Sequence, residues 1–321
     1  LFGSERIAGV VDKLGMQEDE ALEASMLSKS IEKAQKKVEE INFGSRKRLL
    51  EYDDIMNSQR EAIYSKRRNA LSGERIEIDV VNMMQDLAFI YAEKVAEMSY
   101  EEFVDTVKSS LSVDLAAEEH KSSSDLFLSR ETFTKGNTNE IAQIITNNMT
   151  AVYNRKMNVI KQRTLPILRS IAAKEGVAMP DDAKIRIPIS DGRRVYPVVI
   201  NIKKTIESEG NELVRAISKS ITLYRIDESW KEHLREMDDL KQSVQNATYE
   251  QKDPLLIYKF ESFNLFSAML EELNKNVTAF LLRANIPLRD GGNQTVEAPA
   301  APRKPDMSQM NTSRTDLVTN S

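Results

Sequence analysis

A single tyrosine, Tyr249, lies in the middle of a short polar segment that separates two long stretches of helical pattern. The other residues of this segment offer it little apolar surface: Gln245, Asn246, Ala247, Thr248, Glu250, Gln251 and Lys252. An aromatic ring that has nothing to pack against at the end of an arm is typical of a contact residue. We therefore predict that Tyr249 touches a partner, and a tyrosine folded back onto the arm is the alternative that composition leaves open.

Few other residues could carry chemistry. His233 lies beside Glu232 and one turn before Glu236, but a single imidazole with carboxylates on a charged helix is typical of a solvated surface rather than a metal site. Asp53 and Asp54 are adjacent, and adjacent helical side chains point about 100° apart, so we interpret them as a solvated turn. The chain has no cysteine, no phosphate-binding loop and no Gly-x-Ser-x-Gly motif. We expect no catalytic residue, no metal and no cofactor in this chain.

Two amphipathic helices are predicted within residues 217–284, one on each side of Tyr249. Apolar residues in steps of three and four mark one face of each helix, so each face must be buried. The first face comprises Leu223, Ile226, Trp230, Leu234, Met237, Leu240 and Val244; the second comprises Leu256, Phe260, Phe263, Phe266, Leu270, Leu273, Val277 and Phe280. Pro254 lacks an N–H group and suits the first turn of the second helix. The pattern predicts a stiff antiparallel pair with Tyr249 at its free end.

A longer helix is predicted over residues 25–72, within the 165 residues that precede the first proline. Its apolar positions recur about every 3.5 residues, so we expect it to lie along partners for most of its length. These positions are Ile31, Ala34, Val38, Ile41, Leu49, Tyr52, Ile55 or Met56 and Ile63, and the polar Gln59 falls on the same face. A glycine at the end of the run, Gly73, marks its termination.

The remaining segments complete a mostly α-helical fold. Helical pattern continues from Ile76 to about Gly176, where Met83 and Met84 read as core residues. Alternating residues around the Asp191-Gly192 pair predict a small β-hairpin near residues 184–202, with Pro188 and Pro197 confined to edges or bulges. Residues 291–321 have few large apolar side chains, and we expect a disordered tail.

The bulk composition restricts the function classes. The 321 residues carry a net charge of −5, which argues against nucleic acid as the main partner, and no apolar stretch is long enough to span a bilayer. The absence of cysteine is compatible with a reducing compartment. Residues 28–68 are locally basic, with eleven Lys or Arg against seven Asp or Glu. That excess indicates a solvated helix face, and a surface for acidic lipid headgroups or an acidic neighbour is the alternative.

Three blocks of sequence resemble the C-terminal part of the SecA family, the ATP-driven motors of bacterial protein secretion. The first resembles the end of that family's second nucleotide-binding domain, the second its scaffold helix and the third its two-helix finger. The blocks contain Leu1-Phe2-Gly3-Ser4-Glu5-Arg6-Ile7 and Lys13-Leu14-Gly15-Met16; Leu49-Leu50-Glu51-Tyr52-Asp53-Asp54 and Gln59-Arg60; and Trp230-Lys231-Glu232-His233-Leu234, Tyr249, Gln251-Lys252-Asp253-Pro254 and Glu261-Ser262-Phe263.

The resemblance implies a division of the chain. Residues 1–24 would end the second nucleotide-binding domain, 25–72 would be the scaffold helix, and 73–215 a helical wing carrying the hairpin. Residues 216–290 would form the finger and the return to the scaffold, and 291–321 the tail. Motor domains that bind ATP and Mg²⁺ would lie upstream of Leu1, in a parent enzyme of which this chain is the non-catalytic part.

The resemblance also implies partners. The finger would enter the cytoplasmic mouth of the SecYEG channel, and Tyr249 would touch the translocating preprotein, a task that suits a ring with both apolar area and a hydroxyl. The protein would be cytoplasmic and peripherally bound to the inner face of the cell membrane.

Three features depart from the family pattern. Many relatives have Leu-Arg-Gly where this chain has Asn246-Ala247-Thr248, and many end in a Cys/His zinc motif that this chain, ending at Ser321, does not contain. The hairpin is not a general family feature. A free-standing helical adaptor or coiled-coil scaffold, with the arm as an oligomerisation hairpin, is the alternative function.

Overall fold

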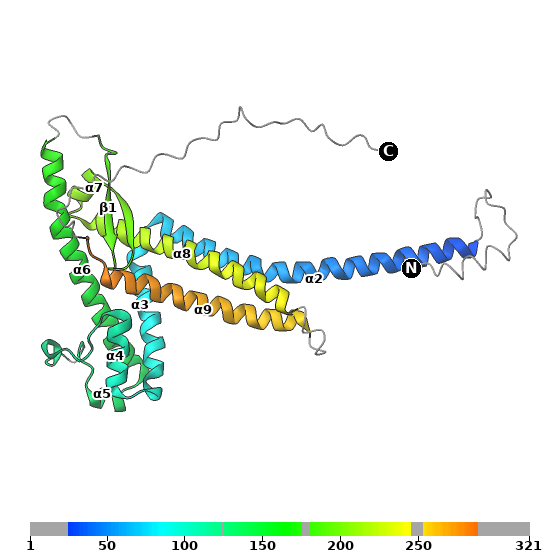
Figure 1. The fold of residues 1–321 in the computed structure, drawn as a ribbon, viewed down its shortest axis with the longest axis horizontal. Coiled ribbons are helices and arrows are strands. Elements are labelled where there is room, and N and C mark those ends of the chain that lie inside the picture. Colours follow the sequence, from blue (N-terminus) through cyan, green and yellow to red (C-terminus); the bar gives the residue numbers. More distant parts are fainter. Residues whose placement is uncertain (1–24, 124, 175–179, 245–252, 288–321) are drawn as a thin grey trace, which may run out of the picture. The chain divides into compact units, whose positions relative to one another are not determined.

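The computed structural model describes residues 25–123, 125–174, 180–244 and 253–287, which belong to one compact unit. These residues are mostly helical, with one two-stranded sheet, and Figure 1 gives the labels used below. The predicted fold class is confirmed; the predicted tail lies outside the described residues. In chain order the elements are α2 (Ser25–Ser72), α3 (Ile76–Glu93), η1 (Lys94–Glu97), α4 (Tyr100–Leu111), η2 (Glu118–His120), α5 (Arg130–Lys135), α6 (Thr138–Lys174), β1 (Lys184–Ser190), β2 (Val195–Asn201), α7 (Ile202–Glu207), α8 (Asn211–Ser243) and α9 (Pro254–Arg283).

The long helix α2 is continuous, but only its second half is packed. From Tyr52 onward it lies beside α8 and α9, and Ile63 and Ala70 are buried (Figure 1). In the first half, Ile31, Ile41 and other predicted contact positions are exposed, with Ile41 54% exposed. Among the described residues, α8 and α9 reach only the second half of α2. The prediction that partners line most of the helix is confirmed for that half and stays a prediction for the first half.

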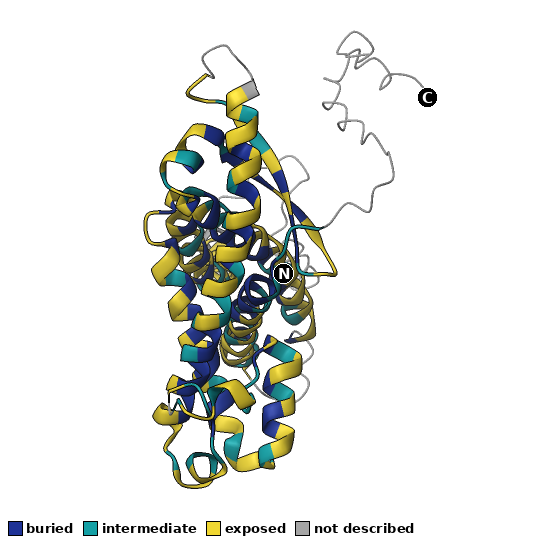
Figure 2. Ribbon diagram, turned by 90° about the vertical axis from the view of Figure 1, so that its left-hand side faces the viewer, coloured by how far each residue is buried: buried dark blue, intermediate teal, exposed yellow. Residues whose placement is uncertain are grey.

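Helices α3, α4, α5 and α6, which fall within the segment 73–215 predicted to be the wing and are called the wing below, contain most of the helical core. Met83 and Met84 are buried as predicted, against residues of α6 and α9. Serine caps define the starts of α4 and α5: the Ser99 and Ser129 hydroxyls accept hydrogen bonds from the first-turn N–H groups of Glu102 and Thr132. Figure 2 shows the buried residues as bands along the inner faces of the helices.

The predicted hairpin is present as β1 and β2, paired antiparallel from Lys184–Asn201 to Ser190–Val195. Its turn depends on the Asp191-Gly192 pair. Gly192 has φ +90°, a conformation that a side chain would strain, and the Asp191 Oδ1 atom accepts hydrogen bonds from the Arg193 and Arg194 N–H groups at 2.9 and 2.7 Å.

Two prolines limit this sheet to two strands. Pro188 lies opposite Pro197, and since neither has an N–H group, their outward-facing backbone positions weaken both edges. The chain after α9 forms one bridge to β1, in which Ser190 and Asn285 exchange two hydrogen bonds of 2.8 Å. The next bonded pair in that register would join Pro188 to Pro287. Neither can donate, which explains why the bridge is isolated.

The hairpin packs on the arm, the pair of helices α8 and α9, through the buried apolar side chains of its strands, among them Tyr196. Tyr196 of β2 is buried, and its ring centroid lies 5.2 Å from that of Phe280 in α9. Glu228 of α8 accepts hydrogen bonds from Arg194 in the turn at 3.0 Å and from Arg225 at 2.8 Å. Exposed ion pairs contribute at most about 1 kcal/mol, so the buried ring is the stronger attachment.

Arg283 joins the end of α9 to the wing. Its guanidinium group donates to the main-chain oxygens of Ser109 and Ser110 at 2.7 Å each and to the Ser112 hydroxyl at 2.8 Å. These acceptors lie at the C-terminal end of α4, where the unpaired carbonyl groups of a helix attract a cation. The wing is thus tied to the base of the arm by a charged cap.

Candidate functional site

The arm formed by α8 and α9 is the candidate site, and its predicted tip lies outside the described residues. This applies to Tyr249 and to the other tip residues of the prediction, Gln245, Asn246, Ala247, Thr248, Glu250, Gln251 and Lys252. The structure fixes the two ends of that segment. Val244 is buried at the end of α8, and α9 begins at Pro254 behind an Asp253 carboxylate that caps the Leu255 N–H group at 3.0 Å.

The predicted apolar face of α8 is confirmed, and that of α9 only in part. All seven predicted positions of α8 are buried or half-buried, including Trp230, and so are the five of α9 from Phe266 onward. Leu256, Phe260 and Phe263 were predicted to be buried, but they are 66%, 65% and 67% exposed. Apolar residues occur on nearly every face of the first turns of α9, so helical periodicity could not identify the inner face.

Inward positions near the tip belong instead to a small aromatic cluster. Tyr258 of α9 is buried against Met237 and Val244 of α8, and its ring centroid lies 4.7 Å from that of Tyr52 in α2. Burial, with a smaller contribution from the charges of Asp238 and Asp53, raises the pKa of Tyr258 to about 12. The phenol stays protonated at neutral pH, and the cluster holds three helices together beneath the tip.

A buried hydrogen-bond network joins the same three helices further from the tip of the arm. The Gln59 Nε2 atom of α2 donates to the main-chain oxygen of Ser262 in α9 at 3.0 Å. The Gln59 Oε1 atom lies 2.9 Å from the Nε2 atom of His233 in α8. Because the carboxamide oxygen can only accept, His233 must donate through Nε2–H. One glutamine therefore connects α2 to both helices of the arm.

His233 was predicted to be on a solvated surface, and that prediction is wrong. Its side chain is fully buried, with the ring centroids of Trp230 and Phe266 at 5.5 and 5.6 Å. The imidazole faces the seam of the arm, where α2 covers it. No group of acidic or histidine side chains among the described residues could hold a metal ion.

Burial disfavours the charged form of His233 and lowers its pKa below 6.5. Its Nδ1 atom has no hydrogen-bond partner among the described residues, and the nearest carboxylate oxygen, of Glu236, lies 4.0 Å away. At neutral pH the imidazole is therefore uncharged, with Nε2–H bound to Gln59 and Nδ1 free. Protonation at Nδ1 would place a charge in the buried seam between two aromatic rings, with the Glu236 carboxylate at 4.0 Å as its nearest counter-charge.

Comparison with known proteins gives the same assignment for most of the chain. The profile of the SecA Wing and Scaffold domain matches residues 21–285. The chain belongs to the SecA family. It is 41% identical to the protein translocase subunit SecA of Porphyromonas gingivalis strain W83 over 99% of its length, 47% identical to that of Parabacteroides distasonis over 90%, and 45% identical to that of Bacteroides fragilis over 99%.

The chain spans only about a quarter of the length of these SecA relatives, between 24% and 28%. It corresponds to their wing and scaffold region, to which α2, the wing and the arm belong. None of the described helices is both long enough and apolar enough to cross a bilayer.

Two members of the network were not assigned a role by sequence reasoning, although signals for them exist. Gln59 is a polar residue inside the apolar stripe of α2, and Ser262 is a small polar residue between Phe260 and Phe263. A polar side chain on a predicted seam must find a buried partner, and such a position is the sequence signal for a network of this kind.

Gln59→Ala should lower the free energy of unfolding by about 1–3 kcal/mol, because it leaves the Nε2–H group of His233 buried without a partner and removes the side-chain hydrogen bond to the Ser262 carbonyl. Denaturant unfolding of the 321-residue chain followed by circular dichroism measures the change. Gln35→Ala, at an exposed position in the first half of α2, is the control and should change stability by less than about 0.5 kcal/mol. Equal stability of Gln59→Ala and the wild type would contradict the role of the network.

Stability should fall as the pH is lowered through and below 6.5. The pKa of His233 is lower in the folded state than in the unfolded state, so the unfolded chain takes up the proton first and acid favours unfolding. His233→Gln should flatten this pH dependence between neutral pH and the range where carboxylates titrate. His120→Gln, a change at the only other histidine of the sequence, should leave it intact; thermal unfolding across a pH series decides between them.

Proposed function

We propose that this chain is the scaffold, wing and finger part of an ATP-driven SecA motor that moves preproteins through the SecYEG channel, and that it relays motor motion to the polypeptide. In this proposal the ATP and Mg²⁺ sites lie in motor domains outside this chain, on the cytoplasmic side of the membrane. The observation that carries the proposal is an exposed apolar stripe beside the tip of a braced helical arm. Leu256, Phe260 and Phe263, about two-thirds exposed, form this stripe.

The stripe is suited to contact with a polypeptide or an apolar channel wall. Its residues follow one another at spacings of four and three, so they lie on one side of α9, close to the predicted tip. Large exposed apolar side chains in a contiguous row mark interaction sites. Tyr249 and the stripe would together offer apolar area without a sequence-specific set of polar groups, as a motor that handles varied preproteins requires.

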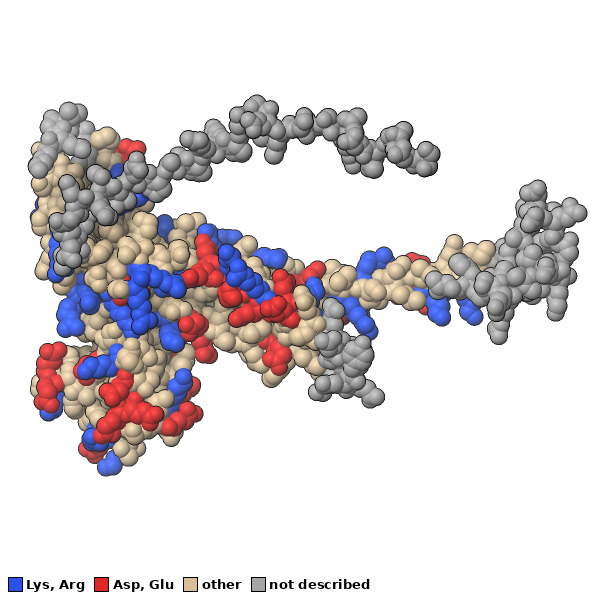
Figure 3. All heavy atoms as spheres, viewed as in Figure 1, with Lys and Arg blue, Asp and Glu red and all other residues tan. Residues whose placement is uncertain are grey.

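The junction beneath the stripe supports a mechanical role. The Gln59 carboxamide and the Tyr52–Tyr258 contact fix α2 to both helices of the arm. A displacement of the first half of α2 would therefore be transmitted to the arm as one rigid body. The exposed apolar residues of that half are available to the motor domains, and its basic residues, seen in Figure 3, to an acidic neighbour or acidic lipid.

Tyr249→Ala in the complete motor should reduce the amount of preprotein transported per ATP consumed, because it removes the apolar ring at the tip. Transport of a labelled preprotein into SecYEG vesicles, measured together with phosphate release, gives this ratio. Tyr64→Ala, a change to an exposed tyrosine on α2 away from the tip, is the control. An unchanged ratio in Tyr249→Ala would remove this residue from the mechanism.

Phe260→Ser combined with Phe263→Ser should impair transport at least as much as Tyr249→Ala while leaving the fold intact. Both side chains are mainly exposed, so their loss removes little buried area and should change the free energy of unfolding by less than about 1 kcal/mol. Val159→Ser combined with Ile167→Ser, at exposed apolar positions of α6 in the wing, is the matched control. A stable double variant with full transport would contradict the role of the stripe.

A further inference from the structure

One side of α3 carries a column of acidic residues that form no ion pair among the described residues. Helix α3 contains four acidic residues and no basic one. Three of them, Asp79, Asp86 and Glu93, are seven residues apart, so they form a column along one side of the helix, drifting by only about 20° per step. None of the three forms an ion pair within the described residues; Asp86 accepts one hydrogen bond, from Asn274 Nδ2 at 3.2 Å.

Exposed apolar residues run beside this acidic column. Ile78, Val81 and Phe89 are 52%, 37% and 43% exposed, and they lie on the outward face of α3, while its inner face packs against α6 and α9. A row of apolar side chains with charges of one sign along its border is the pattern of a groove that takes an amphipathic helix. Charge complementarity then selects a helix with basic residues.

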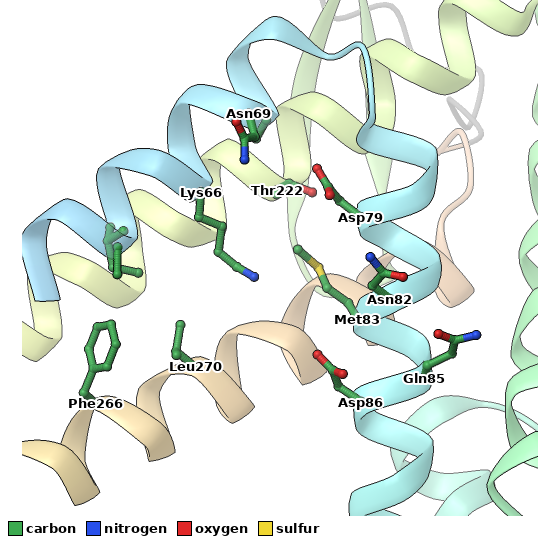
Figure 4. A pocket seen from close by; sticks show the side chains of 13 residues that line it. Lys66, Asn69, Asp79, Asn82, Met83, Gln85, Asp86, Thr222, Phe266 and Leu270 are labelled. Atoms are coloured by element: carbon green, nitrogen blue, oxygen red, sulfur yellow. The ribbon is translucent and has the colours of Figure 1, made fainter. Parts of the chain in front are cut away.

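A pocket of about 550 Å³ opens next to the acidic column, where α2, α3, α8 and α9 meet. Its floor includes Phe266 and Leu270 of α9, and Asp79 and Asp86 form part of the α3 wall. Figure 4 shows Lys66 extending into the same pocket from α2, and it forms no ion pair with either carboxylate among the described residues. The pocket combines apolar area for an aliphatic stem with carboxylates for a cationic end.

A buried hydroxyl in this pocket has no partner. Thr222 of α8 is 1% exposed, and its Oγ1 atom forms no hydrogen bond with the described residues. Buried helical threonines usually bind the carbonyl oxygen four residues earlier, as Thr146 does with Ala142 at 2.8 Å. Figure 4 shows the Thr222 oxygen directed toward the Asp79 side of the pocket. An acceptor so placed, beside a free carboxylate, fits an N–H donor from outside.

We propose that the outer face of α3 and this pocket form a docking surface for a basic amphipathic helix of a protein partner. Lysine or arginine residues at seven-residue spacing pair with Asp79, Asp86 and Glu93, while apolar residues of the partner cover Ile78 and Phe89. One basic side chain enters the pocket, lays its stem on Phe266 and Leu270, and donates to Asp79 and Thr222. The acidity of α3 disfavours nucleic acid and anionic lipid as the occupant.

The test is binding of a fluorescent three-heptad peptide with lysine at every seventh position and leucine on the same face, added to the 321-residue chain. Fluorescence anisotropy measures the affinity. Asp79→Asn, Asp86→Asn and Glu93→Gln together should weaken binding about tenfold, the effect of three partly exposed ion pairs. The control, Asp54→Asn, Glu61→Gln and Asp239→Asn together, changes the net charge equally at exposed positions on α2 and α8 and should keep the affinity within about twofold.

A second pair of variants tests the pocket. Thr222→Val should weaken peptide binding about threefold or more by removing one hydrogen bond. Thr278→Val is its matched control, because Thr278 is also fully buried with an unpaired hydroxyl but does not line this pocket. Circular dichroism checks that each variant is folded. If Thr222→Val does not fold, the triple variant of Asp79, Asp86 and Glu93 still tests the proposal.

Three results would overturn the proposal. A scrambled peptide of the same composition that binds equally well, or an equal loss in the control triple variant, would reduce the effect to general electrostatic attraction. Self-association of the chain that the α3 substitutions abolish, detected by sedimentation, would make a second copy the occupant, through its own basic half of α2. Unaltered binding in both the α3 triple variant and Thr222→Val would remove the surface altogether.

Discussion

The carboxamide of Gln59 is shared between an imidazole on one helix and a main-chain carbonyl on another, in a place that water does not reach. Without the glutamine, the imidazole N–H group would be buried without a partner, at a cost of roughly 1–3 kcal/mol, and the carbonyl would lose its bond to α2. Because the network is satisfied only when α2, α8 and α9 are in one register, it selects that register in a way that apolar packing alone does not. The position of the arm relative to the long helix therefore depends on this contact.

Long periodic elements could be predicted from the sequence because their patterns are local. The continuous α2, the two helices of the arm and the hairpin around Asp191-Gly192 follow from helical spacing, the position of Pro254 and turn chemistry. The edge positions of Pro188 and Pro197 could also be predicted, because both strands of a two-stranded sheet are edge strands. The same reasoning correctly placed Trp230 in the seam of the arm.

The wrong predictions concern which face of a helix is covered by a neighbouring helix. Leu256, Phe260 and Phe263 satisfy the spacing of a buried stripe, but at the start of α9 several faces are apolar, and packing against Tyr52 and Met237 selects the face that contains Tyr258. His233 failed for the opposite reason. Its charged neighbours in the sequence point to solvent, while the imidazole points into the seam, so composition around a residue did not reveal its environment.

The network and the exposed stripe place opposite demands on α9. Toward α2 and α8, the helix presents Tyr258 and Ser262, which are fixed by specific contacts. On its other side it presents Leu256, Phe260 and Phe263, which are about two-thirds exposed. A helix with such a division can exchange partners on its outer face without disturbing its inner one, since the inner contacts hold its position. An apolar outer face costs solubility. Its presence beside the tip is therefore best explained by a partner that covers it during function, and the rigidity of the inner face determines where that partner is met.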